Sequence, residues 1–212
     1  MFRKQLFDTS RGRIVTLLQR GSTTVDALAS ELRLTPSAVR SQLTAMERDG
    51  VVQRSGTRPG TTRPSRVFEL TPEVEQLLSR AYVPLLTHVV DVFTERLSAR
   101  EVEVLLRKVG RALAKQLTAG TRPVGDMRSR LIAASELLNA ELGAVTHVEK
   151  NGSYVIQGAG CPLSALTGKH PAVCVAMETL VKEVTGVPVR ECCDRSGRPR
   201  CCFQVAAESS LR

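Results

Sequence analysis

The first third of the chain combines three stretches of helical apolar spacing with two short strand-like stretches. Residues 8–34 contain two helical patterns, and a third runs from residue 36 to about 49 after a Thr-Pro start. Residues 51–54 and 66–70 are predicted as strands joined by a loop rich in Gly, Pro and Arg. Three helices followed by a hairpin predict a winged helix-turn-helix domain over residues 1–70.

The third predicted helix has an apolar and a polar face. At 3.6-residue periodicity its apolar side chains fall in one narrow sector, and we expect them to face the core. A helix that enters the major groove needs small or basic outward residues, because bulky side chains would hold it away from the base edges. The candidates on this outward face are Ser37, Arg40, Ser41 and Thr44. The candidates for phosphate or minor-groove contacts beside it are Arg54, Arg58 and Arg63.

Residues 71–126 are predicted to be mainly helical. Thr71 begins one helix, Pro84 should kink or break it, and Ser98 with Glu101 forms a capping-box pattern for another. The long apolar stripes of these helices could pack on the C-terminal part of the chain or pair with a second copy. Since a small winged domain gains affinity for a two-half-site operator when it is dimeric, we expect a homodimer.

Residues 127–212 alternate between helical and strand patterns, with a strong hairpin signal at Asn151-Gly152. The chain as a whole is therefore predicted to be α+β, with the winged domain first, a helical dimerisation region next and a cysteine-bearing sensor domain last. The predicted elements of the last part are a helix over 127–142, strands over 144–149 and 153–158, a helix over 171–184, and strands over 187–193 and 201–206.

Charge is unevenly distributed. The formal net charge is +9, and residues 1–70 hold twelve Lys or Arg against six Asp or Glu. Such an excess favours a polyanionic partner, because neutralised phosphates release counterions. A merely basic surface is the alternative that charge alone leaves open. Together with the predicted winged helix, the charge favours double-stranded DNA as partner.

Six cysteines lie within the last 52 residues of the chain. No stretch approaches the roughly 20 apolar residues of a membrane span, and the start lacks the apolar run of a secretory signal, so we expect a cytoplasmic protein. In a reducing compartment, metal binding or redox chemistry is favoured over structural disulfides. Small buried hydrophobic residues are the other use of free cysteine.

The cysteine positions suggest one metal centre. Cys161 lies in a loop and Cys174 in the first turn of a helix, where the helix dipole favours thiolate. If the last hairpin pairs Cys192 with Cys201, their two sulfurs share a face, whereas Cys193 points away with Cys202. The chain has no Cys-x-x-Cys pair to favour zinc, and widely spaced thiolates suit an iron-sulfur cluster.

Two resemblances add to these expectations. The first covers about residues 10–70, which resemble the winged-helix domains of ArsR-like and DeoR-like bacterial regulators. This resemblance is carried by the stretch TTVDALASELRLTPSAVRSQLTAMERDGVVQR. It implies a dimer whose third helix enters DNA. The other, to the Suf-operon repressors of iron-sulfur biogenesis, is carried by GCPLSALTGKHPAVCVAMETLVKEVTGVPVRECCDRSGRPRCCF.

The second resemblance implies a repressor whose iron-sulfur cluster, 4Fe-4S or 2Fe-2S, sets its operator affinity. Cys161, Cys174 and Cys201 fall where that family has its first, second and last cluster cysteines. The third departs from the pattern, since its expected place is near Gly186 and this chain offers Cys192 and Cys193 instead. The fourth ligand is therefore either Cys192 or Cys193, and zinc is the alternative metal.

Two other functions compete with the cluster sensor. The vicinal cysteine pairs could bind zinc, arsenite or an oxidant without a cluster. A cysteine-dependent enzyme fused to a DNA-binding domain is the other. His170 lies between two cysteines, but no orienting partner is identifiable and a nucleophile does not need six thiols. We therefore expect a regulator and no enzyme.

Overall fold

A computed structural model describes residues 8–21, 23–59, 64–121 and 124–206. The chain divides into two compact units, Met1–Arg80 and Ala81–Arg212, and each is described by itself. Among the residues described, no helix is both long and apolar enough to cross a membrane.

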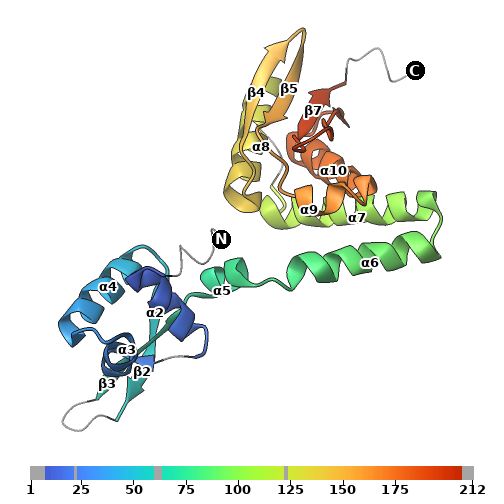
Figure 1. Ribbon diagram of the computed structural model, residues 1–212. Helices are drawn as coiled ribbons and strands as arrows, with labels where there is room; N and C mark the ends of the chain where they lie inside the picture. The colour runs from blue at the N-terminus through green and yellow to red at the C-terminus, as the bar shows by residue number, and fades with distance from the viewer. Residues whose placement is uncertain (1–7, 22, 60–63, 122–123, 207–212) are drawn as a thin grey trace. The chain divides into compact units, whose positions relative to one another are not determined.

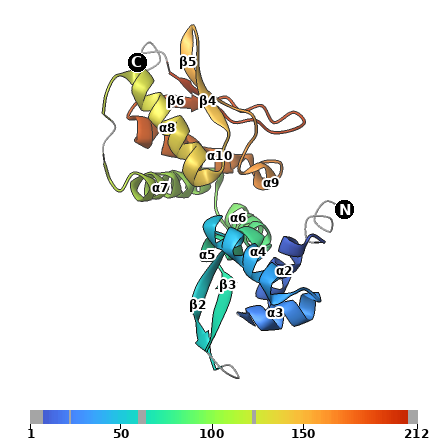
Figure 2. The same cartoon turned by 90° about the vertical axis from the view of Figure 1, so that its left-hand side faces the viewer.

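The first unit contains the expected three helices and hairpin (Figure 2). It also contains a short extra strand, β1. β3 is the central strand of its sheet, in the order β1-β3-β2, and both pairings are antiparallel. The two-residue β1 was not predicted, because two threonines carry no strand pattern of their own. The elements are α2 (Ser10–Leu18), β1 (Thr23–Thr24), α3 (Val25–Leu32), α4 (Pro36–Arg48), β2 (Val52–Arg58), β3 (Ser65–Leu70) and α5 (Pro72–Leu78).

The starts of α2, α3 and α4 follow from their capping residues. The side chains of Thr9, Thr24 and Thr35 accept hydrogen bonds from the backbone N–H groups of Gly12, Ala27 and Ala38. Thr71 precedes α5 as predicted, but its hydroxyl donates to the Gly50 carbonyl and does not cap the helix. The apolar faces meet in one core formed by Ile14, Leu18, Leu28, Ala29, Leu32, Val39, Leu43, Met46, Val52, Phe68 and Leu70.

The second unit is a four-stranded antiparallel sheet with helices packed beside it, in the order β4-β5-β7-β6. Its helices α6 and α7 come before α8 and the sheet in the chain (Figure 1). The elements are α6 (Tyr82–Arg96), α7 (Ala99–Leu117), α8 (Met127–Leu142), β4 (Thr146–Asn151), β5 (Ser153–Gly158), α9 (Ser164–Thr167), the 3-10 helix η1 (Pro171–Val173), α10 (Cys174–Thr185), β6 (Val189–Glu191) and β7 (Cys202–Val205).

Local signals set the bounds of the first helices in this unit. The helical stripe is interrupted as predicted, and Pro84 falls in the first turn of α6, where its missing N–H costs nothing. Ser98 and Glu101 form the predicted capping box of α7. The short helix α9 and η1 were not predicted, because segments this short have no measurable periodicity.

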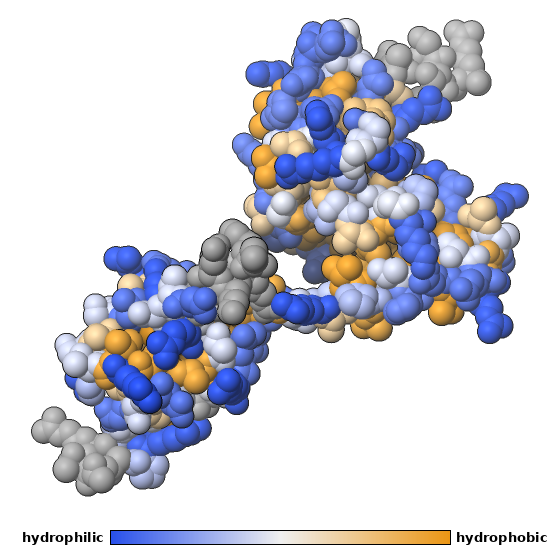
Figure 3. All heavy atoms as spheres, viewed as in Figure 1, coloured by the Kyte–Doolittle hydropathy of each residue, from blue (hydrophilic) through white to orange (hydrophobic). Residues whose placement is uncertain are grey.

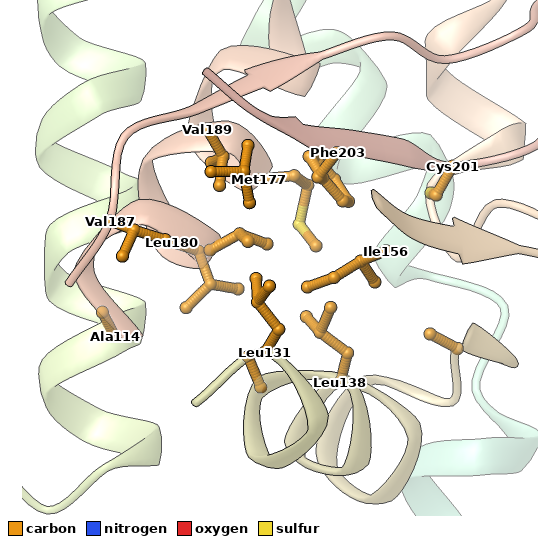
Figure 4. Close-up of a cluster of buried hydrophobic side chains, with 14 residues drawn as sticks. Ala114, Leu131, Leu138, Ile156, Met177, Leu180, Val187, Val189, Cys201 and Phe203 are labelled. Carbon is orange, nitrogen blue, oxygen red and sulfur yellow. The ribbon is translucent and has the colours of Figure 1, made fainter. Parts of the chain in front are cut away.

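The core of the second unit lies between the sheet and α8 and α10 (Figure 4). Leu131, Ile156, Leu180 and Phe203 are each at most 1% exposed. On the other side of α10 lies α7, and Gly110 permits the close approach, since a Cβ there would sit 2.3 Å from the Ala176 carbonyl oxygen. The helix that begins with Cys174 is therefore packed from two sides.

Candidate DNA-binding face and metal centre

The outward face of α4 is arranged as the sequence predicted. Val39, Leu43 and Met46 are buried in the core of the first unit. Ser37, Arg40, Ser41 and Thr44 are all exposed. A helix whose free face carries hydroxyl groups and one guanidinium can approach base edges without steric obstruction.

The hairpin beside α4 is longer than predicted. β2 continues to Arg58, and a bulge lies between Arg54 and Gly56, whose φ of +146° suits glycine. Arg58 is exposed, whereas the exposed Arg54 donates to the Glu47 carboxylate at 2.8 Å. Arg63 lies outside the described residues. In the described part of the wing, Arg54 is therefore held by a neighbouring acid, and Arg58 lies at the end of β2.

The register of the last hairpin differs from our prediction by one residue. Cys192 was expected opposite Cys201, but the Cys192 N–H donates to the Cys202 carbonyl at 2.8 Å, and these two cysteines form a disulfide. The expectation of metal or redox use instead of disulfides was therefore wrong for this pair. The physical reason is the pleat, because opposite residues share a face: the observed register turns Val189 inward with Phe203, whereas the predicted register would turn Arg190 inward.

The same register places Cys193 and Cys201 on the inner face with Phe203. Four cysteines remain free: Cys161, Cys174, Cys193 and Cys201. Cys201 is 4% exposed within the core of the unit, and Cys161 and Cys193 pack against that core. Of the two cysteines between which the sequence left the choice open, Cys192 is therefore disulfide-bonded and Cys193 is a free thiol.

Three ligand atoms converge beside the start of α10. The sulfurs of Cys174 and Cys193 and a carboxylate oxygen of Glu191 all lie within 4.8 Å of one another. Cys201, another free thiol, raises the pKa of Cys193. Cys161 does not belong to this tight group. It lines a neighbouring cavity of about 200 Å³ together with Gly160, Arg198 and Pro199.

The surroundings raise the pKa of two of the cysteines, Cys174 and Cys193. The hydrogen bond with Cys193, followed by burial, holds the pKa of Cys174 far above its ordinary value, against the smaller influence of Arg195. The neighbouring thiol and burial therefore oppose the thiolate that the sequence predicted at this helix start. The pKa of Cys193 is raised to about 12: the hydrogen bond with Cys174 lowers it, but Cys201, burial and Glu191 outweigh that contact.

Glu191 and Arg195 are the residues that sequence reasoning missed. The Glu191 carboxylate accepts from the Cys193 N–H at 2.7 Å and from the Arg195 guanidinium at 2.8 Å. Arg195 also acts on Cys174, because its positive charge lowers the pKa of that thiol. The only signal was an acid two positions before Cys193, which has no meaning until the hairpin register is known.

The helix-turn-helix matches a known family model. Residues 8–54 match the model described as "Bacterial regulatory protein, arsR family". The chain therefore carries an ArsR-type DNA-binding helix-turn-helix and is a transcription regulator, not an enzyme. The match ends before the wing is complete and does not include the second unit. No curated protein matches the sequence.

Solved structures offer only weak likenesses. A mutant of Lactococcus lactis ZitR in apo form has 18% identity and a TM-score of 0.29, covering 53% of this chain and 85% of its own. The adhesin competence repressor AdcR of Streptococcus pyogenes has 20% identity and a TM-score of 0.29, with 51% and 79% covered. Bacillus subtilis PadR in complex with operator DNA has 14% identity and a TM-score of 0.28, with 80% and 87% covered. At these scores none of the three carries an argument about this chain.

Proposed function

We propose that this regulator is a repressor that reads duplex DNA with α4 and the wing. The supporting observation is the exposed face of Ser37, Arg40, Ser41 and Thr44 over a closed apolar core. Arg54, Arg58 and Arg63 would contact phosphates or the minor groove beside it. A partner of this kind implies a location in the cytoplasm, with the chromosome.

The proposed signal is an iron-sulfur cluster in the second unit. The donor set fits such a group, because Cys161, Cys174, Cys193 and Cys201 are free and come from a loop, a helix start and two neighbouring strand ends. When bound, the cluster would supply redox and oxygen sensitivity. The residues of the chain would hold it and respond to its presence, since a ligand shifts an equilibrium only by favouring one arrangement.

The proposed assembly is a homodimer formed through α6. Large apolar side chains occupy its solvent face at helical spacing, and Figure 3 shows hydrophobic surface along the helical edge of the second unit. Two of them, Leu85 and Val92, are 63% and 52% exposed. A monomeric protein rarely leaves a contiguous apolar stripe in water. The residues of the stripe are Tyr82, Val83, Leu85, Leu86, Val89, Val92 and Phe93.

Anaerobic purification with spectroscopy tests the cluster directly. We expect brown protein with broad absorption near about 400 nm and matched iron and sulfide contents. The variants Cys161→Ser and Cys174→Ser should lose iron and sulfide, whereas Cys202→Ser should keep them. Cofactor content that is unchanged in both ligand variants would contradict the proposal.

A single zinc-class cation is the second candidate, and a specific observation favours it. The ligand atoms of Cys174, Cys193 and Glu191 lie within 4.8 Å of one another. A tetrahedral ion with metal–sulfur bonds of about 2.3 Å requires donors that are close together. Colourless protein that binds stoichiometric zinc, and whose zinc affinity falls in Glu191→Gln, would favour this candidate over the cluster.

A further inference from the structure

A short segment connects two of the proposed ligands. Between Cys161 and Cys174 lie α9 and η1, so both ends of the segment would be fixed when a metal centre is held. Within the second unit, α6 contacts α9 of this segment as well as α7. Val90 of α6 is 5% exposed and forms a separate apolar cluster with Leu166 and Val173, with Leu163 packed against it.

Charged groups join the same two elements beside that cluster. Asp91 of α6 places one carboxylate oxygen 2.6 Å from Lys169 Nζ and 2.9 Å from His170 Nε2. The His170 pair has the distance of an ion pair but not the alignment of a hydrogen bond. The other carboxylate oxygen of Asp91 lies 3.4 Å from Nδ1 of His88, which is exposed on α6 itself. The side chains of Asp91 and His170 are 16% and 7% exposed, so water screens their attraction less than at the surface.

Lys169 and His170 lie immediately before η1 and Cys174. The His170 backbone N–H donates to the Leu166 carbonyl at 2.8 Å, and the Val173 N–H donates to the His170 carbonyl at 3.2 Å. Lys169 and His170, which contact Asp91, are therefore fixed to η1, the turn that leads directly to the proposed metal ligand Cys174. A displacement of Cys174 would move His170 with it.

We propose that Asp91, Lys169 and His170, with the apolar contact of Val90, form a latch that transmits metal occupancy from the Cys161–Cys174 segment to α6. The inference rests on the proposed function, because it assumes that metal binding fixes both ends of the segment. α6 is the first element of the second unit, and the chain continues from it into the DNA-binding unit. It also carries the proposed dimer face, so its placement affects both half-site spacing and assembly.

Asp91→Asn tests the latch while leaving every cysteine in place. The substitution keeps the size of the side chain and removes the charge that holds Lys169 and His170. The matched control is Glu95→Gln, the same chemical change in the same helix. Operator affinity is measured for metal-loaded and metal-free protein by fluorescence anisotropy, on a duplex selected from a random-sequence library with the wild-type protein.

We expect Asp91→Asn to retain the metal content and spectrum of the wild type. The ratio of metal-loaded to metal-free operator affinity, typically 5- to 150-fold in coupled systems, should fall towards one, whereas Glu95→Gln keeps it. A ratio in Asp91→Asn equal to that of the wild type would overturn the latch and leave the proposed function standing. A wild-type ratio of one would overturn the proposed function, and the latch with it.

A second measurement does not depend on the metal. Hydrogen–deuterium exchange of the α6 peptide that contains Val90 should be faster in metal-free Asp91→Asn than in metal-free wild type. If Asp91→Asn is too unstable to measure, Lys169→Met can replace it, because the Lys169 side chain is 63% exposed. This variant should also show faster exchange of the α6 peptide. Unchanged exchange in both variants would show that the contact does not hold α6 in solution and would reject the latch.

Discussion

At the scale of single residues, neighbouring cysteines have opposite roles. Cys192 and Cys193 are adjacent in the chain, yet the pleat of the strand sends them to opposite faces of the hairpin. Cys192 reaches Cys202 and forms the disulfide, whereas Cys193 joins Cys174 and Glu191. The same separation applies to Cys202 and Cys201. A vicinal pair could bind one arsenite with both of its sulfurs only if the strand lost its pleat at that pair and the disulfide were reduced, because adjacent strand residues point to opposite faces in any register.

Alkylation mapping tests this division of the cysteines. In metal-free protein denatured without reductant, we expect label on Cys161, Cys174, Cys193 and Cys201. Cys192 and Cys202 should be labelled only after reduction, because their sulfurs are bonded to each other. Mass spectrometry of the peptides checks the pattern, and uniform label on all six before reduction is the contradicting result.

At the scale of elements, α10 links the core, the thiols and α7. Its first residue is Cys174, its buried face fills the core between the helices and the sheet, and its Glu178 carboxylate accepts the Glu191 N–H at 2.8 Å. The same Glu178 lies 3.8 Å from the Arg107 guanidinium of α7. The approach of α7 to α10 depends on Gly110, where no side chain intervenes. The position of the thiol group is therefore set by helix packing as well as by the hairpin.

Gly110→Ala should destabilise the second unit by about 1–3 kcal/mol, because the added Cβ would overlap the Ala176 carbonyl oxygen and force α7 from α10. The matched control is Gly168→Ala, where a Cβ meets nothing within 4 Å and φ is −65°. Chemical denaturation gives the free energy of unfolding of both variants. Equal stability of the two would show that the helices separate without cost.

At the scale of the whole molecule, the proposed functions belong to different units. The first carries the DNA-binding face and the second carries the free thiols, the latch and the apolar stripe of α6. A repressor that responds to a metal needs the second unit to alter how two copies of the first engage DNA. The stripe on α6 is the surface of the second unit best suited to join two copies, because burying it removes large apolar side chains from water.

Leu85→Asp should convert a dimer into monomers, because it places a charge in the centre of the stripe. Light scattering after size-exclusion chromatography gives the mass, and operator affinity should fall with the loss of the second half-site contact. Arg100→Asp, which adds the same carboxylate at an exposed position of α7, is the control and should remain dimeric. A monomeric wild type, or a dimeric Leu85→Asp, would contradict the α6 interface.

The sequence by itself determined the elements whose signals are local. The caps Thr24, Thr35 and Ser98 and the turn at Asn151-Gly152 lie next to the elements they define, so the bounds of the long helices and the first hairpin of the second unit were predictable. The exposed face of α4 was predictable too, because helical periodicity alone separates it from the buried face.

Only the tertiary structure decided which side chains meet across the second unit. The last hairpin has no strong turn signal, and its register buries Val189 of β6 in the core together with Phe203 and Val205 of β7. That one-residue choice placed Cys193 instead of Cys192 beside Cys174 and brought Glu191 into the group. Asp91 and His170 lie 79 positions apart in the chain, and their meeting depends on how α6 packs on α9. Neither contact has a local signal, because each arises from packing between elements distant in sequence.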